Sequence, residues 1–348
     1  MNELMSLQDL GDTLDQELRG PSPQLRDRVL TDIGRPPGRA MPRRPRPGFG
    51  RRLVIRGSLA VALAAALFTA STLRLWGTAP AASAQAAEIL RRAAVAAQQQ
   101  PTLAAGPAQF VYVESLESAA AMTGDASGRI TSVHVDTNLY EEWNSASGTR
   151  NGLQRTQPRS PSSPGRPAGS WQTTALPGCR NGRPNPAAGA AMALPAGRCV
   201  PQPAYQAGLP RSARAMSAYL YRNSHGQNPP AVQAFITAGD LIRGSYVRPA
   251  ALAALFAAVA QIPGVSVAHH ALNAAGQRGV AVQQTYRGIS EQLIFNPRTY
   301  AFIGERQVAI GASSGLRVGT VLDSTAILRV AVVNQAGEFP RPGRSGTG

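Results

Sequence analysis

The chain has 348 residues, a formal net charge of +16, 28 prolines and 35 glycines. All 35 basic residues are arginines, and aromatic residues make up only 5% of the chain. The arginines are scattered through proline- and glycine-rich stretches and do not line one helix face, so we expect no nucleic-acid partner, and the length leaves room for one sizeable domain beside a membrane segment.

Residues 1–56 form a first region whose start is acidic and rich in leucine. Short helices are predicted at 3–18 and 23–33. Leu7, Leu10 and Leu14 follow one another at steps of three and four, which gives an apolar seam and makes them candidate partner-binding residues. Because such a short helix is marginal in water by itself, the seam needs a partner. The alternative interpretation is a solvated tail that is mostly disordered.

Residues 57–73 carry no charge and lie between Arg56 and Arg74. As a helix this run spans about 26 Å, close to a hydrocarbon core of about 30 Å, and we predict a transmembrane signal anchor at 57–76. Eight arginines lie between residues 35 and 56. The positive-inside rule therefore places residues 1–56, with their arginine-rich juxtamembrane segment, in the cytoplasm and the rest of the chain outside the cell membrane.

A cleaved export signal is the alternative to a retained anchor. Ala82, Ser83 and Ala84 have the small-x-small pattern of a signal-peptidase site. However, the 56 residues ahead of the apolar run are much longer than a secretory n-region. We therefore favour the retained anchor, while cleavage after Ala84 stays open.

Residues 77–340 are predicted to form an exported α+β domain, followed by a disordered C-terminus at 341–348. Helices are predicted at 81–100, 213–221, 230–242 and 249–261, and strands at 109–114, 129–135, 139–143, 153–156, 265–268, 279–286, 291–295, 299–309 and 324–333. A turn at Asn296, Pro297 and Arg298 separates two of these strands. Strands, then helices, then strands again are typical of a curved antiparallel sheet packed on helices.

The segment 157–209 is rich in proline, glycine, serine and arginine, and we interpret it as a low-complexity insert in this domain. It holds the two cysteines of the chain, Cys179 and Cys199. In an oxidising compartment a disulfide between them is expected, and closing such a loop is worth roughly 3 kcal/mol in the chain-entropy model. The alternative is a pair of free thiols in a flexible loop.

No set of residues predicts a catalytic or metal centre. Residues 311–315 match the Gly-x-Ser-x-Gly pattern, but a strand is predicted after them where that motif needs a helix, so we interpret them as a loop. His269 and His270 are neighbours in a predicted strand and point to opposite faces, as do Glu141 and Glu142. Four further acids stand isolated in the sequence: Asp240, Glu291, Glu305 and Asp323. We therefore expect no enzyme activity, no metal and no cofactor.

Aromatic residues recur at strand spacing along the predicted domain. The set comprises Phe110, Tyr112, Tyr140, Trp143, Phe295, Tyr300 and Phe302. Most of them are expected to be core residues. A concave sheet lined by such side chains is also suited to hold a lipid or a peptide.

Five segments of the chain resemble, in order, the conserved blocks of a family of uncharacterised actinobacterial single-pass membrane proteins. They are GPAQFVYVES at 106–115, LPRSARAMSAYL at 209–220, VRPAALAALFAAVAQIPGVSVAHHALNAAGQRGVAV at 247–282, LIFNPRTYAFIGER at 293–306 and VGTVLDSTAILRVAVVNQAG at 318–337. Members of this family often lie beside a sigma-factor gene, and the resemblance brings no catalytic residue or cofactor with it. The half-barrel pattern of the domain is also similar to the lipoprotein-carrier fold of periplasmic sigma-regulatory proteins.

The sequence thus predicts a single-pass membrane protein with a regulatory or sensory role. The resemblance implies a sigma factor as the partner of the cytoplasmic tail, and the leucine seam agrees with that. The alternative is a binding module, in which the exported domain holds a lipid or an envelope peptide and the tail is inert. An envelope structural protein with neither activity is a third hypothesis.

Overall fold

The computed structural model describes residues 81–125, 130–159, 169–185, 199–311 and 316–341. The predicted tail and anchor, with Leu7, Leu10 and Leu14, lie outside these residues. Within the described ranges, none of the helices has the length and apolarity needed to cross a membrane.

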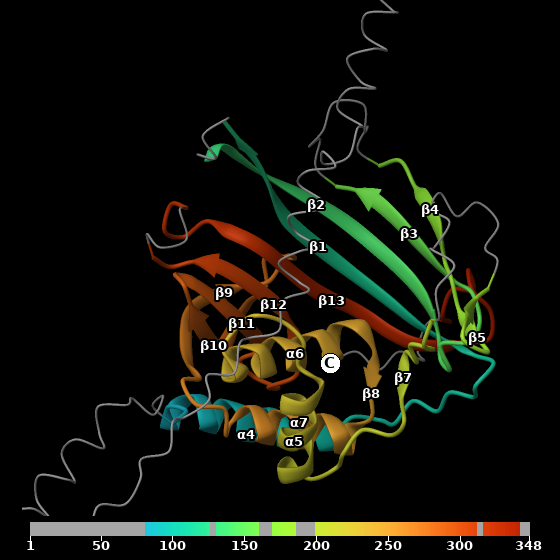
Figure 1. Cartoon of the computed structure of the whole chain (residues 1–348), viewed down its shortest axis with the longest axis horizontal. Coiled ribbons are helices and arrows are strands. Elements are labelled where there is room, and N and C mark those ends of the chain that lie inside the picture. Colours follow the sequence, from blue (N-terminus) through green and yellow to red (C-terminus); the bar gives the residue numbers. More distant parts are fainter. Residues whose placement is uncertain (1–80, 126–129, 160–168, 186–198, 312–315, 342–348) are drawn as a thin grey trace, which may run out of the picture. The chain divides into compact units, whose positions relative to one another are not determined.

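In the described residues, nine strands form one antiparallel sheet with the order β4-β3-β2-β1-β13-β12-β11-β10-β9 (Figure 1). The strands are β1 Phe110–Gly124, β2 Ile130–Ser145, β3 Gly152–Pro158, β4 Gln172–Leu176, β9 Ser266–Leu272, β10 Arg278–Tyr286, β11 Ile289–Phe295, β12 Phe302–Ala309 and β13 Val321–Val333. The helices are α4 Ala84–Gln99, α5 Ala213–Asn223, α6 Pro230–Gly244 and α7 Pro249–Val259. The predicted α+β fold, a large antiparallel sheet packed against helices, is confirmed.

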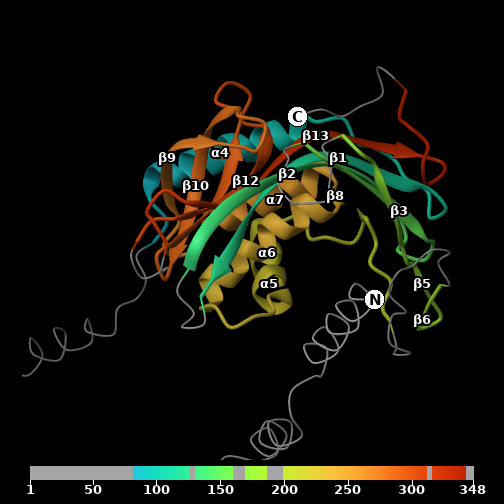
Figure 2. The same cartoon turned by 90° about the horizontal axis from the view of Figure 1, so that it is seen from above.

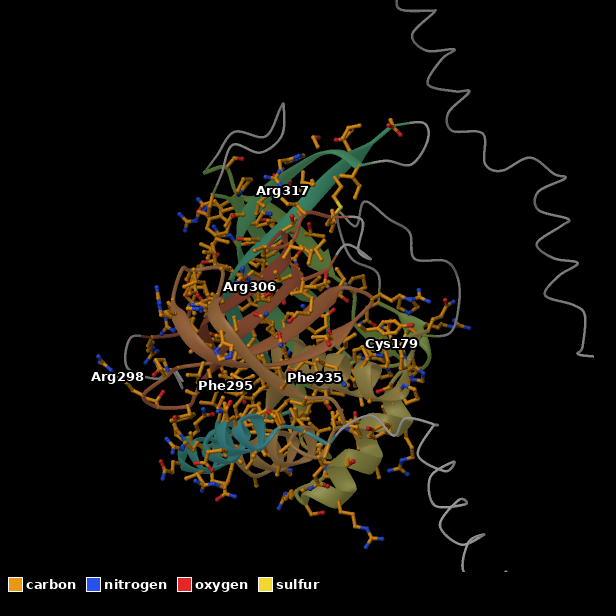
Figure 3. The ribbon with its side chains drawn as sticks, turned by 90° about the vertical axis from the view of Figure 1, so that its left-hand side faces the viewer. Cys179, Phe235, Phe295, Arg298, Arg306 and Arg317 are labelled. Atoms are coloured by element: carbon orange, nitrogen blue, oxygen red, sulfur yellow. A yellow bond between two sulfur atoms is a disulfide. The ribbon has the colours of Figure 1, made fainter. Side chains whose placement is uncertain are left out.

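The helices lie on one side of the sheet, which we call its helix face (Figure 2). Helix α7 packs between α4 and α5, while α4 and α6 contact β10. Their apolar sides meet the sheet in one core, which includes Leu90, Phe235, Leu255, Phe256 and Phe295. Figure 3 labels Phe235 of α6 and Phe295 of β11, which enter this core from opposite layers.

Local sequence signals account for where the helices begin. Ser83 caps α4, because its Oγ accepts a hydrogen bond from the Ala86 amide at 3.2 Å. Ser212 caps α5 in the same way, through the Ala215 amide. Helices α6 and α7 start with Pro230 and Pro249, where the missing amide hydrogen costs nothing. The sequence pattern located these helix starts well, the first within three residues.

Strands β1 and β2 are longer than the sequence predicted. They pair without a break from Phe110 opposite Ser145 to Thr123 opposite Ser132. The two separate strands predicted at 129–135 and 139–143 are therefore wrong, because β2 runs through both. Residues 136–138 interrupt the apolar pattern, yet each of them pairs with β1 in the middle of the sheet, so tertiary pairing overrides the weak local propensity.

The turn between β11 and β12 is the one that the sequence predicted. The side-chain oxygen of Asn296 accepts hydrogen bonds from the amides of Arg298 and Thr299, at 2.9 and 3.1 Å. Arg298 stands at the rim of the domain in Figure 3. The next strand begins only at Phe302, later than the predicted start at 299.

The segment 157–209 contributes more structure than a low-complexity insert would. Strand β4 adds to the sheet beside β3, and the short strands β5 Cys179–Arg180 and β6 Arg183–Pro184 form a hairpin. Further along, β7 Tyr205–Gln206 pairs with β8 Tyr246–Val247. Cys179 and Cys199 form a disulfide with their Cα atoms 5.9 Å apart, so the predicted pairing is confirmed (Figure 3).

Candidate functional site

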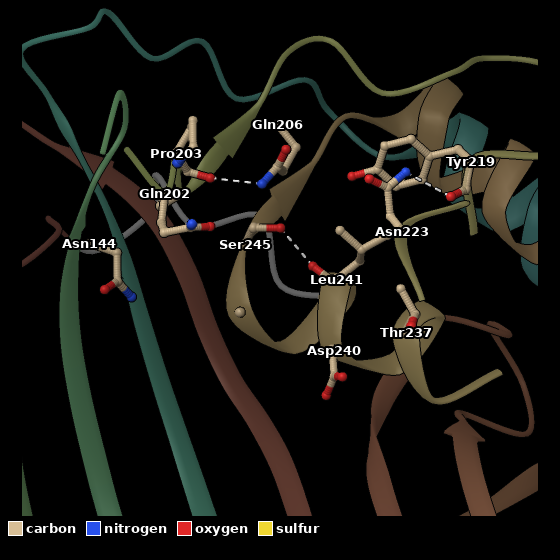
Figure 4. Close-up of a pocket in the computed structure, with 12 residues that line it drawn as sticks. Asn144, Gln202, Pro203, Gln206, Tyr219, Asn223, Thr237, Asp240, Leu241 and Ser245 are labelled. Carbon is tan, nitrogen blue, oxygen red and sulfur yellow. Dashed lines mark hydrogen bonds between the residues drawn. The ribbon is translucent and has the colours of Figure 1, made fainter. Parts of the chain in front are cut away.

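Two adjoining cavities lie between α6 and the helix face of the sheet. The first, of about 330 Å³, is bordered by Asn144 of β2, by residues 202–206 and by α5 and α6 (Figure 4). The second, of about 280 Å³, is bordered by α6 and by strands β11, β12 and β13. Asp240 borders both cavities, and we call the two together the cleft.

The second cavity gathers the acids that stand apart in the sequence. It is lined by Asp240 from α6, Glu291 from β11, Glu305 from β12 and Asp323 from β13. The register explains the three strand positions, because Gln307 of β12 pairs with Glu291 on one side and with Asp323 on the other. Neighbouring residues in paired strands share a face, so these carboxyl groups all point toward α6.

Arg243, one turn after Asp240 on α6, lies among these carboxylates. Its Nη2 is 2.7 Å from Asp240 Oδ1, and its Nη1 is 3.7 Å from Glu305 Oε2. Burial acts to lower the pKa of Arg243, but the surrounding carboxylates, Glu305 first among them, outweigh it and raise the pKa above its ordinary value. Arg306 also borders the cavity, although its guanidinium reaches the carbonyl of His270.

Glu305 is the most perturbed group of the cleft. Its Oε1 is buried and accepts no hydrogen bond from the described residues. Burial, reinforced by the negative charges of Asp240 and Asp323, raises the pKa of Glu305 to about 7 although Arg243 acts in the opposite direction. A glycine faces this carboxyl on α6: a Cβ added at Gly239 would lie 2.9 Å from Glu305 Oε1. With a side chain at residue 239, the Glu305 carboxyl would have to shift from this position.

The neighbouring carboxyl groups are perturbed in the same direction. Burial raises the pKa of Glu291, even though Gln307 donates a hydrogen bond to it. Burial also raises the pKa of Asp323 and of Glu117, a residue of β1 that accepts a hydrogen bond from Ser115. Several acids, most of them half-buried, surround Arg243, so the cleft is a place where added positive charge is favourable.

Glu141 and Glu142, which are neighbours in the sequence, point to opposite faces of the sheet, as predicted. Glu141 forms an ion pair with Arg155 at 3.2 Å on the face opposite the helices, while Glu142 accepts a hydrogen bond from Gln154 on the helix face. His269 and His270 are both exposed on β9. No group of three potential metal ligands occurs in the described part of the chain. Residues 312–315 of the Gly-x-Ser-x-Gly pattern lie outside it, and a strand, β13, does follow.

The aromatic residues that suggested a lipid cradle do not border this cleft. Phe110, Tyr112 and Trp143 pack together on the outer face of the sheet, the one opposite the helices. Phe295 packs edge-on against Phe256 of α7, and Tyr300 hydrogen-bonds Arg92. Acids and amides make up much of the lining of the cleft instead, so the aromatic cradle, the alternative to core packing, is not where the cleft lies.

Comparison with known proteins adds no family to this picture: no family model, no curated protein and no solved structure matches the chain. The fold and the cleft define a class only, an α+β domain with a polar, acid-lined cavity between a helix and a curved sheet. Function is therefore inferred from the cleft itself.

Proposed function

We propose that the chain is a single-pass membrane protein with a sensory role, whose exported domain binds a ligand bearing cationic amino groups in the acid-lined cleft. The class of ligand is an envelope peptide with basic side chains. This develops the binding-module alternative of the sequence analysis and specifies that the ligand is positively charged.

The observation that carries the proposal is the ratio of charges in the second cavity. Four carboxyl groups border it, and Arg243 is paired with two of them. The buried Oε1 of Glu305 still has acceptor capacity that the described residues leave unused. An ammonium or guanidinium group entering beside it would relieve both the repulsion and the missing hydrogen bond. The carboxylates of the cavity would repel an anionic lipid headgroup, which disfavours the lipid alternative.

Export and anchoring rest on the sequence. The apolar run at 57–76 and the arginines ahead of it support a retained anchor with the domain outside. The Cys179–Cys199 disulfide agrees with an oxidising compartment. A sigma factor as the partner of the cytoplasmic tail remains a proposal, supported by the leucine seam and by the family resemblance.

The ligand class can be tested by titrating the purified full chain in detergent with a trilysine peptide and with a triglutamate peptide. We expect trilysine alone to bind, and binding to weaken as salt is added because exposed charges are screened. The double variant Asp240→Asn/Asp323→Asn should bind trilysine at least about tenfold more weakly, since it removes two of the attracting charges and keeps the shape of the cavity.

The matched control is Glu88→Gln, which removes a carboxylate that is exposed on α4 and does not border the cleft. This variant should bind trilysine as the unchanged chain does. Equal affinity for both peptides, or a loss in the control that matches the loss in the cleft variant, would overturn the proposal.

A further inference from the structure

The last described residues, 334–341, follow β13. Residues 338–341 lie against the outer face of the sheet, and we call them the strap. Two side chains, Trp143 and Arg329, donate three hydrogen bonds to it. The indole Nε1 of Trp143 donates to the carbonyl of Glu338 at 2.6 Å. Arg329 Nη2 donates to the carbonyls of Pro340 and Arg341, at 3.0 and 2.9 Å. All three bonds end on main-chain oxygens, so the donors recognise an extended backbone without regard to its side chains.

Rings on the same face supply the second type of contact. Phe339 lies edge-on to Trp143 and Tyr112, with ring centroids 5.4 and 6.2 Å apart. The guanidinium of Arg155 lies 5.6 Å from the Phe339 ring and 4.2 Å from the ring of Trp171. Pro340 is buried. An aromatic side chain and the proline after it therefore lie side by side against aromatic and arginine side chains of the outer face.

The strap is held loosely compared with the strands around it. Residues 334–339 are exposed, and Phe339 keeps 49% of its surface accessible. Among the described residues, the main chain of the strap makes no hydrogen bond to the main chain of a strand, and the bond from the Glu338 amide to the Gln335 carbonyl is internal to the segment. The strap is held in place by the two donor side chains and by the ring contacts, and such a segment can leave without breaking the sheet.

We propose that Tyr112, Trp143, Arg155 and Arg329 form a recognition groove for an extended aromatic–proline peptide, and that the strap is its built-in, releasable occupant. Proline fixes its own backbone and biases the residue before it toward an extended conformation, which lowers the ordering cost of binding. Aromatic-lined grooves whose donors reach peptide carbonyls bind proline-containing segments in this way. The partner is a protein that offers such a segment, and its binding would displace the strap.

This groove is independent of the cleft. Side chains alternate along β1, so Tyr112 faces the groove while Val111 and Val113 pack toward residues 204 and 246 on the helix face. A failure of the cleft proposal would leave the groove untouched, and the reverse also holds.

The test uses a fluorescein-labelled peptide with the sequence of residues 336–341 and two forms of the full-length protein. In the strapless form, residues 338–348 are deleted. We expect fluorescence anisotropy to show binding to the strapless form, and binding at least about tenfold weaker to the intact chain, where the tethered strap competes at a high effective concentration. Arg329→Gln in the strapless form, and replacement of Phe339 and Pro340 by alanine in the peptide, should each abolish the signal.

Folding is checked by circular dichroism, because deletion uncovers apolar surface. If the strapless form unfolds, the full-length variant Phe339→Ala/Pro340→Ala takes its place, since it keeps the chain length and weakens only the ring contacts. A folded variant that binds no peptide at high micromolar concentration would overturn the proposal, as would equal binding after Arg329→Gln. A dimer of the intact chain that dissociates on Phe339→Ala would also overturn it, because the occupant would then be the strap of a second copy.

Discussion

Glu305 is a carboxyl group whose charged form is unfavourable in the folded domain. Its pKa is raised from an ordinary 4.5 to about 7, first by burial and then by neighbouring acids. A raised pKa means that the folded state binds protons more strongly than the unfolded state. The contribution to stability is therefore fully present below pH 4.5 and is lost as the pH rises through 7. Glu117, Glu291 and Asp323 shift in the same direction and add to the effect.

We expect the melting temperature of the domain to fall between pH 5 and pH 8, and Glu305→Gln to flatten that fall. The variant should gain on the order of 1–3 kcal/mol of unfolding free energy at pH 8, because a neutral amide has no charge to desolvate. Chemical denaturation at both pH values measures this. The control is Glu88→Gln, because hydrogen bonds from Arg91 and Arg92 lower the pKa of that exposed carboxyl to about 2. An unchanged pH dependence in Glu305→Gln would contradict the burial argument.

At the scale of the elements, α6 carries a glycine where a helix prefers alanine. Replacing an interior helix glycine by alanine gains about 1 kcal/mol from backbone entropy. At Gly239, however, the new Cβ would lie 2.9 Å from Glu305 Oε1, closer than real Cβ contacts. Gly239→Ala should therefore gain less than this, because the Glu305 carboxyl has to shift, and in a Glu305→Ala background the same change should stabilise the domain by up to about 1 kcal/mol. Denaturant unfolding of the four proteins measures this coupling, and equal effects of Gly239→Ala in both backgrounds would refute it.

Elements with strong local signals were predictable from the sequence, and those that depend on pairing were not. The caps at Ser83 and Ser212 and the prolines at 230 and 249 mark helix starts that local chemistry fixes. The far ends of β1 and β2 carry exposed side chains, so only their mutual pairing defines them. Strand β4 has no apolar alternation and exists because β3 offers an edge.

The cleft was not predicted, because its acids come from one helix and three strands whose register is unknown before folding. One signal was present in the sequence. Glu291, Leu293 and Phe295 alternate along one strand, which puts an acid on the same face as two core residues. A charged residue on a core face is rarely fully buried without a partner, so this pattern can point to a site. The aromatic residues of the outer face were predicted as core residues. That the strap covers them could not be predicted from the sequence, because it depends on how the chain folds back after β13.

At the scale of the whole molecule, a sensor of the proposed kind needs a cytoplasmic segment that passes the signal to a partner. In the helix that the sequence predicts at 3–18, Leu7, Leu10 and Leu14 would form an apolar seam, and because so short a helix is marginal alone, a partner would have to bury it. Burial of one leucine is worth roughly 1.5–3 kcal/mol before ordering costs. Acids beside the seam, such as Asp9 and Asp12, would face a basic surface on the partner, and binding should weaken with added salt.

We predict that a peptide of residues 1–34 binds a sigma factor, the partner that the family resemblance implies, and that Leu10→Asp weakens binding by about tenfold or more, because a carboxylate replaces a side chain that would be buried. Isothermal titration of the two peptides measures the difference. Gln8→Asp is the matched control: it adds the same charge off the seam and should not remove binding. If the unchanged peptide fails to bind at high micromolar concentration, or if Leu10→Asp binds equally well, the tail has no regulatory partner of this kind, and the role of the protein lies in its exported domain alone.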